Sequence, residues 1–276
     1  MPVVGAIGAA IRLVHPAPTL AVTALSGALG GILLSQAGQP LDDRWLTMVV
    51  AVLGSQVFVG ATNDLVDRGR DTAAGRLSKP LAAGSLSPGA AVWVGSLGLA
   101  VQLAASLRLG WPFLPLGLVA VGSALAYNLW LSRTPLSVVP YLVSFGVLPL
   151  WVAAGVDVPF ERVAIAPLLV APYAAAAHLA NVLRDFDADA ALASRNLAQV
   201  LGRDRAFTVA WRLALAVGLA VGAALLLGGP VQPLAIGLGV VGLAAIAQGI
   251  RGAEALWMGM LVSAVCWTAA WAISTG

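Results

Sequence analysis

Long apolar stretches dominate this chain, and short polar segments separate them. Nine of the stretches approach the length of a membrane-spanning helix, which needs about 20 predominantly apolar residues. The predicted spans cover residues 17–35, 45–61, 89–107, 111–131, 136–154, 163–179, 207–227, 231–249 and 255–273. We therefore predict an all-α integral membrane protein whose residues 1–276 form a single transmembrane domain.

Composition supports a membrane protein and argues against other classes. Of the 276 residues, 60% are hydrophobic and only 10% are charged, and the mean hydropathy is +0.93. The 15 basic residues are scattered through the polar segments instead of forming a patch, so we expect no binding of nucleic acid. The single cysteine, Cys266, allows no intrachain disulfide.

The distribution of lysine and arginine predicts the orientation in the membrane. If the N-terminus is cytoplasmic, only Arg44, Arg108 and Arg162 of the 15 basic residues fall on the outer side. Cytoplasmic segments carry an excess of lysine and arginine in membrane proteins. We therefore predict a multi-pass protein of the cell membrane with a cytoplasmic N-terminus.

Two acidic clusters, residues 63–71 and 181–189, share one spacing and lie in predicted cytoplasmic connections. They hold six of the 12 acidic residues, and matching positions are 118 residues apart. The matched side chains are Asn63, Asp67 and Asp71 in the first cluster and Asn181, Asp185 and Asp189 in the second. Each cluster follows an apolar span and precedes a polar connection, which indicates an approximate internal repeat.

The spacing of the clusters is typical of a Mg²⁺ site. Residues four apart share one face of a helix, so each cluster would present a stripe of oxygen ligands. Mg²⁺ binds such oxygens, usually through a few carboxylates together with substrate phosphate. We predict the metal ligands to be Asn63, Asp64, Asp67, Asp71, Asn181, Asp185 and Asp189, with Asp67, Asp71, Asp185 and Asp189 as the catalytic residues. Only His15 and His178 could supply imidazole, which argues against zinc.

Cations and aromatic rings complete the predicted chemistry. Basic side chains near the clusters could bind phosphate oxygens, namely Arg68, Arg70, Arg76, Lys79, Arg184 and Arg195. A metal-bound diphosphate beside an apolar cavity indicates ionisation of a prenyl diphosphate, because the metal stabilises the departing group and the helices bury the prenyl tail. Aromatic rings on central spans could stabilise the allylic cation, namely Tyr127, Tyr141, Phe145 and Tyr173, although each ring alone is more often a packing residue.

The first cluster, Asn63-Asp64-x-x-Asp67-x-x-x-Asp71, resembles the first aspartate-rich motif of the UbiA superfamily of intramembrane prenyltransferases. The second, Asn181-x-x-Arg184-Asp185-x-x-x-Asp189, resembles the second motif of that family. The segment Arg76-Leu77-Ser78-Lys79-Pro80-Leu81 looks like the continuation of the first motif, and weaker similarity occurs at Arg12 and from Tyr127 to Arg133. The resemblance covers nearly the whole chain.

That resemblance implies nine helices in a ring around a central cavity, with cytoplasmic cap loops over the motifs. It also implies Mg²⁺-dependent transfer of a prenyl group from a prenyl diphosphate to a lipophilic or aromatic acceptor within the lipid bilayer. Lys79, Arg133 and nearby arginines, including Arg12, would contact the diphosphate. The chain departs from the family pattern at Ser132-Arg133, where a lysine is common, and at Ser194-Arg195-Asn196, where a glycine and a threonine are common. Both departures bear on the identity of the acceptor more than on the metal chemistry.

Two other functions remain open from the sequence. A terpene cyclase of the same superfamily would ionise the same substrate without an acceptor. A membrane carrier could use the carboxylates for cation passage, but such acids usually lie in the middle of a span instead of at its end. A CDP-alcohol phosphotransferase also uses clustered aspartates, but its required glycine and alanine-arginine positions are missing here.

Overall fold

Local sequence sets where the long helices begin and end. Asp42 accepts a hydrogen bond from the backbone N–H of Trp45 at 2.9 Å, and Ser87 accepts one from Ala90 at 3.1 Å, so both side chains cap the helices that follow them. Prolines occupy the first turn of five of the long helices, where the missing N–H costs nothing. Gly110 ends one helix with a φ of 77°, a conformation that favours glycine.

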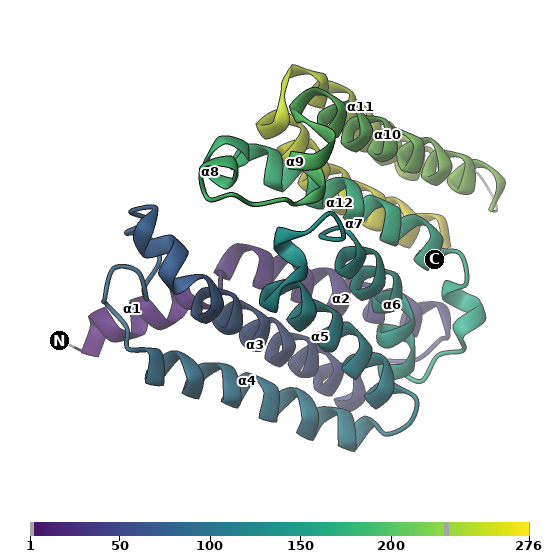
Figure 1. Ribbon diagram of the computed structural model, residues 1–276. Coiled ribbons are helices and arrows are strands. Elements are labelled where there is room, and N and C mark those ends of the chain that lie inside the picture. The colour runs from purple at the N-terminus through teal and green to yellow at the C-terminus, as the bar shows by residue number, and fades with distance from the viewer. Residues whose placement is uncertain (1–2, 229–231, 276) are drawn as a thin grey trace.

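The computed structural model describes residues 3–228 and 232–275, and the described residues form helices and turns without a strand (Figure 1). The long helices are α2 (Pro16–Gln36), α3 (Asp43–Ala73), α4 (Pro88–Leu109), α5 (Phe113–Leu129), α6 (Val139–Gly155), α7 (Ala166–Arg184), α10 (Arg203–Leu227), α11 (Pro233–Gln248) and α12 (Ala253–Thr275). The short elements are α1 (Val3–Leu13), α8 (Phe186–Ala191) and α9 (Leu197–Leu201), with 3₁₀ turns η1 (Leu131–Arg133), η2 (Phe160–Val163) and η3 (Gly249–Arg251).

Each predicted span overlaps one long helix, but the helices differ in length. Seven segments are long and apolar enough to cross a membrane. The other two, α5 and α6, have 17 residues each, or about 26 Å at 1.5 Å per residue. That is shorter than a hydrocarbon core of about 30 Å. The all-helical fold with long apolar helices is thus confirmed, whereas nine crossings arranged in a ring stay a prediction.

The two acidic clusters differ in backbone structure, which corrects the sequence-based expectation. The apolar pattern predicts that the second span ends at Ala61, but α3 continues to Ala73 and carries the first cluster on its last turns. The second cluster does not form one continuous helical stripe, because α7 ends at Arg184 and α8 begins at Phe186. Asp185, with φ −103° and ψ 17°, lies at this junction.

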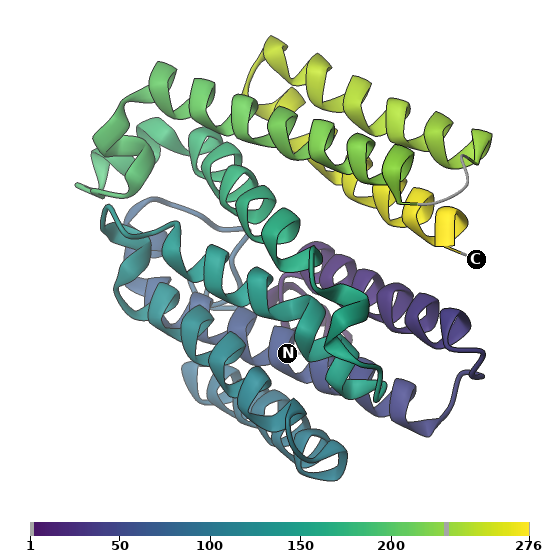
Figure 2. The ribbon, with the colours of Figure 1, turned by 90° about the vertical axis from the view of Figure 1, so that its right-hand side faces the viewer.

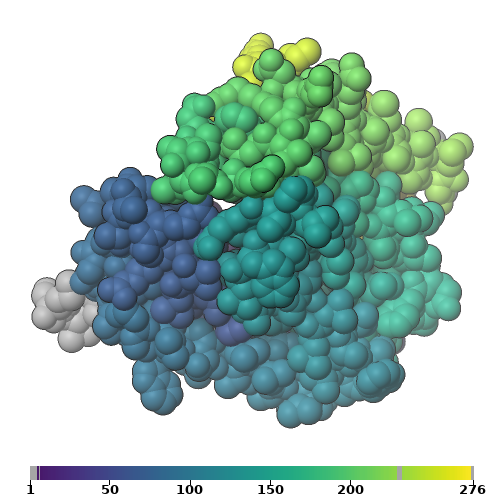
Figure 3. All heavy atoms as spheres, in the orientation of Figure 1, coloured from purple at the N-terminus to yellow at the C-terminus, as the bar shows by residue number. Residues whose placement is uncertain are grey.

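The helices bury two main cores. The first joins α2–α6 around Trp151, Phe113 and Met48. The second joins α7 to α10–α12 around Leu179 and Leu256. Figure 2 shows α10–α12 as a layer beside the N-terminal helices, with α7 between them. The acidic end of α3 and the α8–α9 segment lie at the same end of the molecule, where Figure 3 shows blue, teal and green parts of the chain in contact.

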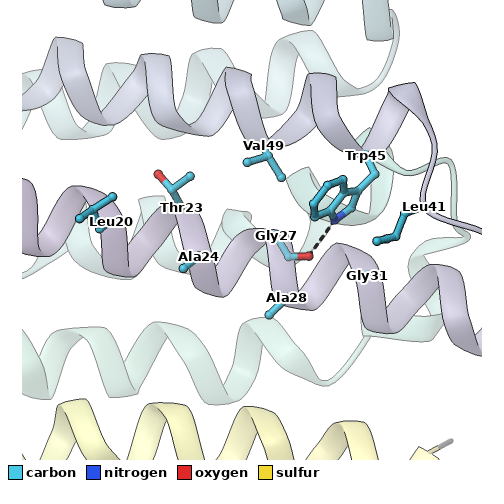
Figure 4. A pocket seen from close by; sticks show the side chains of 9 residues that line it. All are labelled: Leu20, Thr23, Ala24, Gly27, Ala28, Gly31, Leu41, Trp45 and Val49. Atoms are coloured by element: carbon cyan, nitrogen blue, oxygen red, sulfur yellow. Dashed lines mark hydrogen bonds between the residues drawn. The ribbon is translucent and has the colours of Figure 1, made fainter.

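A separate apolar hollow of about 440 Å³ lies between α2 and the start of α3 (Figure 4). Leu20, Gly27, Leu41 and Val49 are among its lining residues, and no charged side chain lines it. Trp45 also lines the hollow, and its indole N–H donates a hydrogen bond to the Gly27 carbonyl at 2.9 Å. The hollow therefore offers apolar surface and no group for phosphate chemistry.

Close packing of α3 on α4 depends on two facing glycines. A Cβ added to Gly98 would lie 2.7 Å from the Gly54 carbonyl oxygen, and a Cβ on Gly54 would lie 2.7 Å from the Gly98 oxygen. Small residues let helix backbones approach each other in membrane proteins, where packing contacts stabilise helix association.

We predict that Gly98→Ala lowers stability by about 1–3 kcal/mol through overpacking. Gly222→Ala on α10 is the control, because a Cβ there meets no atom within 4 Å. Thermal unfolding of both variants in detergent checks this, and equal midpoints for the two variants would contradict the packing assignment.

Candidate active site

One small cavity brings the two acidic clusters together. Asp67 and Asp71 reach it from α3, and Asp189 reaches it from α8. Its remaining lining residues are Arg70, Arg76 and Leu192, and its volume is about 50 Å³. Residues more than 100 positions apart therefore share one site, as the common spacing of the clusters predicted.

Arginines neutralise the two carboxylates of the first cluster that line the cavity. Arg133, from η1, donates to an Asp67 oxygen at 2.8 Å. Arg76 donates to Asp71 at 3.3 Å from the turn that follows α3. Asp71 is buried and Asp67 is partly buried, so each carboxylate needs a nearby cation to offset lost hydration. Arg76 also lines the cavity, whereas Arg133 contacts Asp67 without being part of the lining.

Asp189 is the residue of the second acidic cluster that lines the cavity. Its carboxylate accepts a hydrogen bond from the Asn196 amide at 2.9 Å. Burial raises the pKa of Asp189 above its ordinary value, and the neighbouring Asp185 carboxylate raises it further, while Arg70 opposes the shift. Asn196 also caps α9 by accepting from Gln199 N–H at 3.0 Å, which fixes the loop behind Asp189.

The other two members of the second cluster lie outside the cavity lining. Asp185 is exposed at the end of α7, and Asn181 is partly buried one turn before it. The charge of Asp185 still acts on Asp189. Their metal roles stay predictions.

Asp64 lies in a different environment from Asp67 and Asp71. It is 1% exposed, and one oxygen contacts Lys79 Nζ at 2.5 Å and His15 Nε2 at 2.9 Å. Lys79 also lies 3.1 Å from the same imidazole nitrogen. Asp64 and Lys79 therefore neutralise each other beside the cavity, and neither lines it. This geometry gives the predicted metal role of Asp64 and the phosphate role of Lys79 no direct support.

His15 is part of this buried network and was not predicted as a site residue. It precedes α2 with φ 51° and ψ 72°, a left-handed conformation that is unusual for a residue other than glycine. The turn at residues 14–16 directs its imidazole toward Asp64. Only the neighbouring prolines in the sequence mark this turn.

Several of the predicted phosphate-binding arginines, Arg133 among them, are not among the residues that line the cavity. Arg184 pairs with Glu254 at 2.6 Å, and its guanidinium lies 5.8 Å from the ring centre of Trp257. Arg184 thus connects α7 to α12. Arg12 is exposed on α1, and Arg195 exposes its side chain while its backbone N–H donates to the Arg133 carbonyl at 3.2 Å.

Three of the four predicted aromatic residues form one cluster. The rings of Tyr127 and Tyr141 meet edge to face at 5.2 Å, and Tyr141 stacks on Phe145 at 6.0 Å. His178 joins them 4.4 Å from Tyr141. Tyr173 lies apart, because its hydroxyl donates to the Met260 carbonyl at 2.7 Å and contacts Ser263. Tyr173 therefore packs α7 against α12.

The oxygen atoms at the cavity suit a hard cation whose coordination is completed by a bound ligand. All of the anionic groups, Asp67, Asp71 and Asp189, supply oxygen. Within residues 3–228 and 232–275, no three histidine, cysteine, aspartate or glutamate side chains are close enough to hold a metal by themselves. Mg²⁺ suits such a site, because it usually binds through one or two carboxylates together with substrate phosphates.

Comparison with known proteins identifies the family. The model of the UbiA prenyltransferase family matches residues 24–254. This chain belongs to the UbiA prenyltransferase family. A search of curated proteins finds no match.

Solved structures of UbiA proteins share the fold of this family member. A UbiA homologue from Aeropyrum pernix K1 is 22% identical, with a TM-score of 0.70 over 92% of this chain and 97% of that one. A UbiA homologue from Archaeoglobus fulgidus bound to GPP and Mg²⁺ is 16% identical, with a TM-score of 0.69 over 97% and 100%. A structure of digeranylgeranylglyceryl phosphate synthase is 14% identical, with a TM-score of 0.71 over 96% and 98%.

We predict that Asp64→Asn destabilises the protein by about 3–5 kcal/mol, because it leaves the partly buried Lys79 without its counter-charge. Asp187→Asn is the matched control. It breaks an exposed pair with Arg203 and should cost at most about 1 kcal/mol. Thermal unfolding in detergent distinguishes the two variants. An Asp64→Asn protein that is as stable as the control but binds no metal would instead make Asp64 a ligand.

Proposed function

We propose that this UbiA family member transfers a prenyl group from a prenyl diphosphate to a lipophilic or aromatic acceptor in a Mg²⁺-dependent reaction. The observation that carries the proposal is the cavity in which Asp67 and Asp71 meet Asp189 between arginines. Three carboxylates and two or more arginines in one cavity provide opposite charges for a metal ion and for the diphosphate that accompanies it.

The carboxylates and arginines have separate roles in this reaction. Bound Mg²⁺ would supply Lewis-acid stabilisation of the departing diphosphate. Asn63, Asp67, Asp71 and Asp189 would hold the metal. Arg133 and Arg76, which pair with Asp67 and Asp71, would release these carboxylates and bind phosphate oxygens. The exchange keeps every charge paired, which matters because unpaired buried charges are costly.

The aromatic cluster suits stabilisation of the allylic cation that forms when the diphosphate departs. Tyr127, Tyr141 and Phe145 present ring faces and edges on α5 and α6. Ring faces attract a cation, and the apolar helices around them exclude water that would otherwise capture it. Tyr127 directly precedes Asn128, whose amide contacts Asn63 of the first acidic cluster.

The family and the structural neighbours support the same chemistry. The Archaeoglobus fulgidus homologue binds GPP and Mg²⁺ and shares this fold over 97% of the present chain. The long apolar helices support a location in the lipid bilayer. From the distribution of basic residues, we infer that the acidic cavity and the N-terminus face the cytoplasm.

We predict that purified protein with Mg²⁺ consumes a prenyl diphosphate between C10 and C50, and that Asp67→Ala and Asp185→Ala each abolish turnover in a folded protein. Asp187→Ala is the control, because Asp187 is an exposed acid in the same cluster and pairs with Arg203. Mass spectrometry of products, with and without candidate acceptors, provides the measurement. Unchanged turnover in either variant would show that the replaced aspartate is not part of the active site. If the unmodified protein consumed no prenyl diphosphate, the proposed function would be wrong.

Metal affinity should also depend on pH through Asp189. Its pKa is raised by burial and by Asp185, so lowering the pH protonates this carboxylate before an ordinary aspartate. Metal ligands must be deprotonated to bind. We therefore expect Mn²⁺ affinity, measured by electron paramagnetic resonance, to fall as the pH drops from 7 toward the raised pKa. Asp189→Asn should weaken binding and flatten this dependence; an unchanged pH dependence would exclude Asp189 as a ligand.

A further inference from the structure

Asn128 is a buried amide that belongs to neither acidic cluster. It lies near the end of α5, directly after Tyr127, and is 3% exposed. Its side chain reaches across to α3 and contacts three residues there. A buried amide costs free energy unless it is hydrogen-bonded, so its partners determine how it is oriented.

A backbone carbonyl fixes the orientation of the Asn128 amide. Asn128 Nδ2 lies 2.9 Å from the Val59 carbonyl oxygen and 3.0 Å from the Thr62 hydroxyl oxygen. The carbonyl oxygen only accepts hydrogen bonds, so the amide NH₂ must face it. The Thr62 hydroxyl lies 2.8 Å from the Phe58 carbonyl and donates along its own helix, which leaves its oxygen free to accept. The Asn128 oxygen therefore faces away from Val59.

That orientation determines how Asn63 is turned. The Asn128 oxygen lies 3.4 Å from Asn63 Nδ2 and accepts a hydrogen bond from it. The same Asn63 nitrogen lies 3.4 Å from an Asp67 oxygen, which can also only accept. Both neighbours thus require the NH₂ group of Asn63 on their side. No described residue donates a hydrogen bond to the Asn63 side-chain oxygen, which is left available as a ligand.

We propose that Asn128 is a positioning residue that orients the Asn63 amide so that its oxygen, and not its nitrogen, is presented to the metal. The inference rests on the proposed Mg²⁺-dependent function. Mg²⁺ requires an oxygen ligand, and an amide flipped by about 180° would present NH₂ to the cation. Partners behind a metal ligand commonly set its orientation, and their loss costs about 10–100-fold in metal affinity or activity.

The test compares Asn128→Leu in two backgrounds. Mn²⁺ binding to the full chain is measured by electron paramagnetic resonance, with a C10 prenyl thiolodiphosphate that cannot readily ionise. With Asn63 present, Asn128→Leu should weaken Mn²⁺ binding about tenfold or more. With Asn63→Asp, the same substitution should change affinity less than about threefold, because a carboxylate presents oxygen in either orientation. Such non-additivity identifies a coupling between the two residues.

Controls separate positioning from general damage. Ser144→Ala removes a hydrogen bond between a different pair of helices, from the Ser144 hydroxyl on α6 to the Ala120 carbonyl on α5 at 3.0 Å, and should leave Mn²⁺ affinity unchanged. Asn128→Ala serves in place of Asn128→Leu if the larger side chain prevents folding. Thermal unfolding of each variant accompanies the titrations.

The possible outcomes are distinct. If the unmodified protein binds no Mn²⁺ with the analogue, the proposed function fails and the inference fails with it. If the unmodified protein binds Mn²⁺ and Asn128→Leu binds it equally well, only the inference is overturned. An equal loss with and without the Asn63→Asp substitution would also overturn it, because the effect would then be structural.

Discussion

Crowding of negative charge between α3 and α8 is the constraint on which the rest of the structure depends. Carboxylates from two distant clusters share a cavity of about 50 Å³, and like charges this close destabilise each other. Burial raises the pKa of Asp189, and the nearby Asp185 carboxylate of the same cluster raises it further. Arg133, Arg76 and the Asn196 amide offset this crowding by donating hydrogen bonds to the three carboxylates.

The fold makes this charge cluster possible by two different arrangements. On one side, α3 is 31 residues long, about 46 Å, so its acidic end extends beyond the length that a bilayer core requires. On the other side, α7 ends at Arg184 and the chain turns through Asp185 into α8, which carries Asp189 back toward α3. At the site, the end of the long helix α3 therefore meets the α8–α9 segment, in which Asn196 caps α9. The apolar helices behind the site supply the environment in which paired charges are stabilised most strongly.

Sequence alone predicted the parts of this picture that depend on local pattern. Apolar runs located the helices, and the repeated spacing led us to expect the two clusters together. Asp67, Asp71 and Asp189 do line one cavity, whereas Asp185, the counterpart of Asp67, lies outside its lining. Other features depend on the three-dimensional positions of side chains. The repeated spacing leaves Asp64 out of the matched residues, but it does not show that Asp64 pairs with Lys79 and His15. Arg184 lies within the second motif but pairs with Glu254 of α12, and Tyr173 packs against α12 instead of joining the other aromatic rings. Nothing in the sequence indicated a role for Asn128, because its contacts form only where α5 crosses α3.

The central claim is that both acidic clusters bind one metal-diphosphate group. Calorimetric titration of the purified protein with a non-ionising prenyl thiolodiphosphate tests it most directly. We predict binding in Mg²⁺, no binding in excess chelator, and loss of binding when either Asp67 or Asp189 alone is replaced by asparagine. Binding without a divalent cation, or full affinity after loss of the charge at either position, would contradict it.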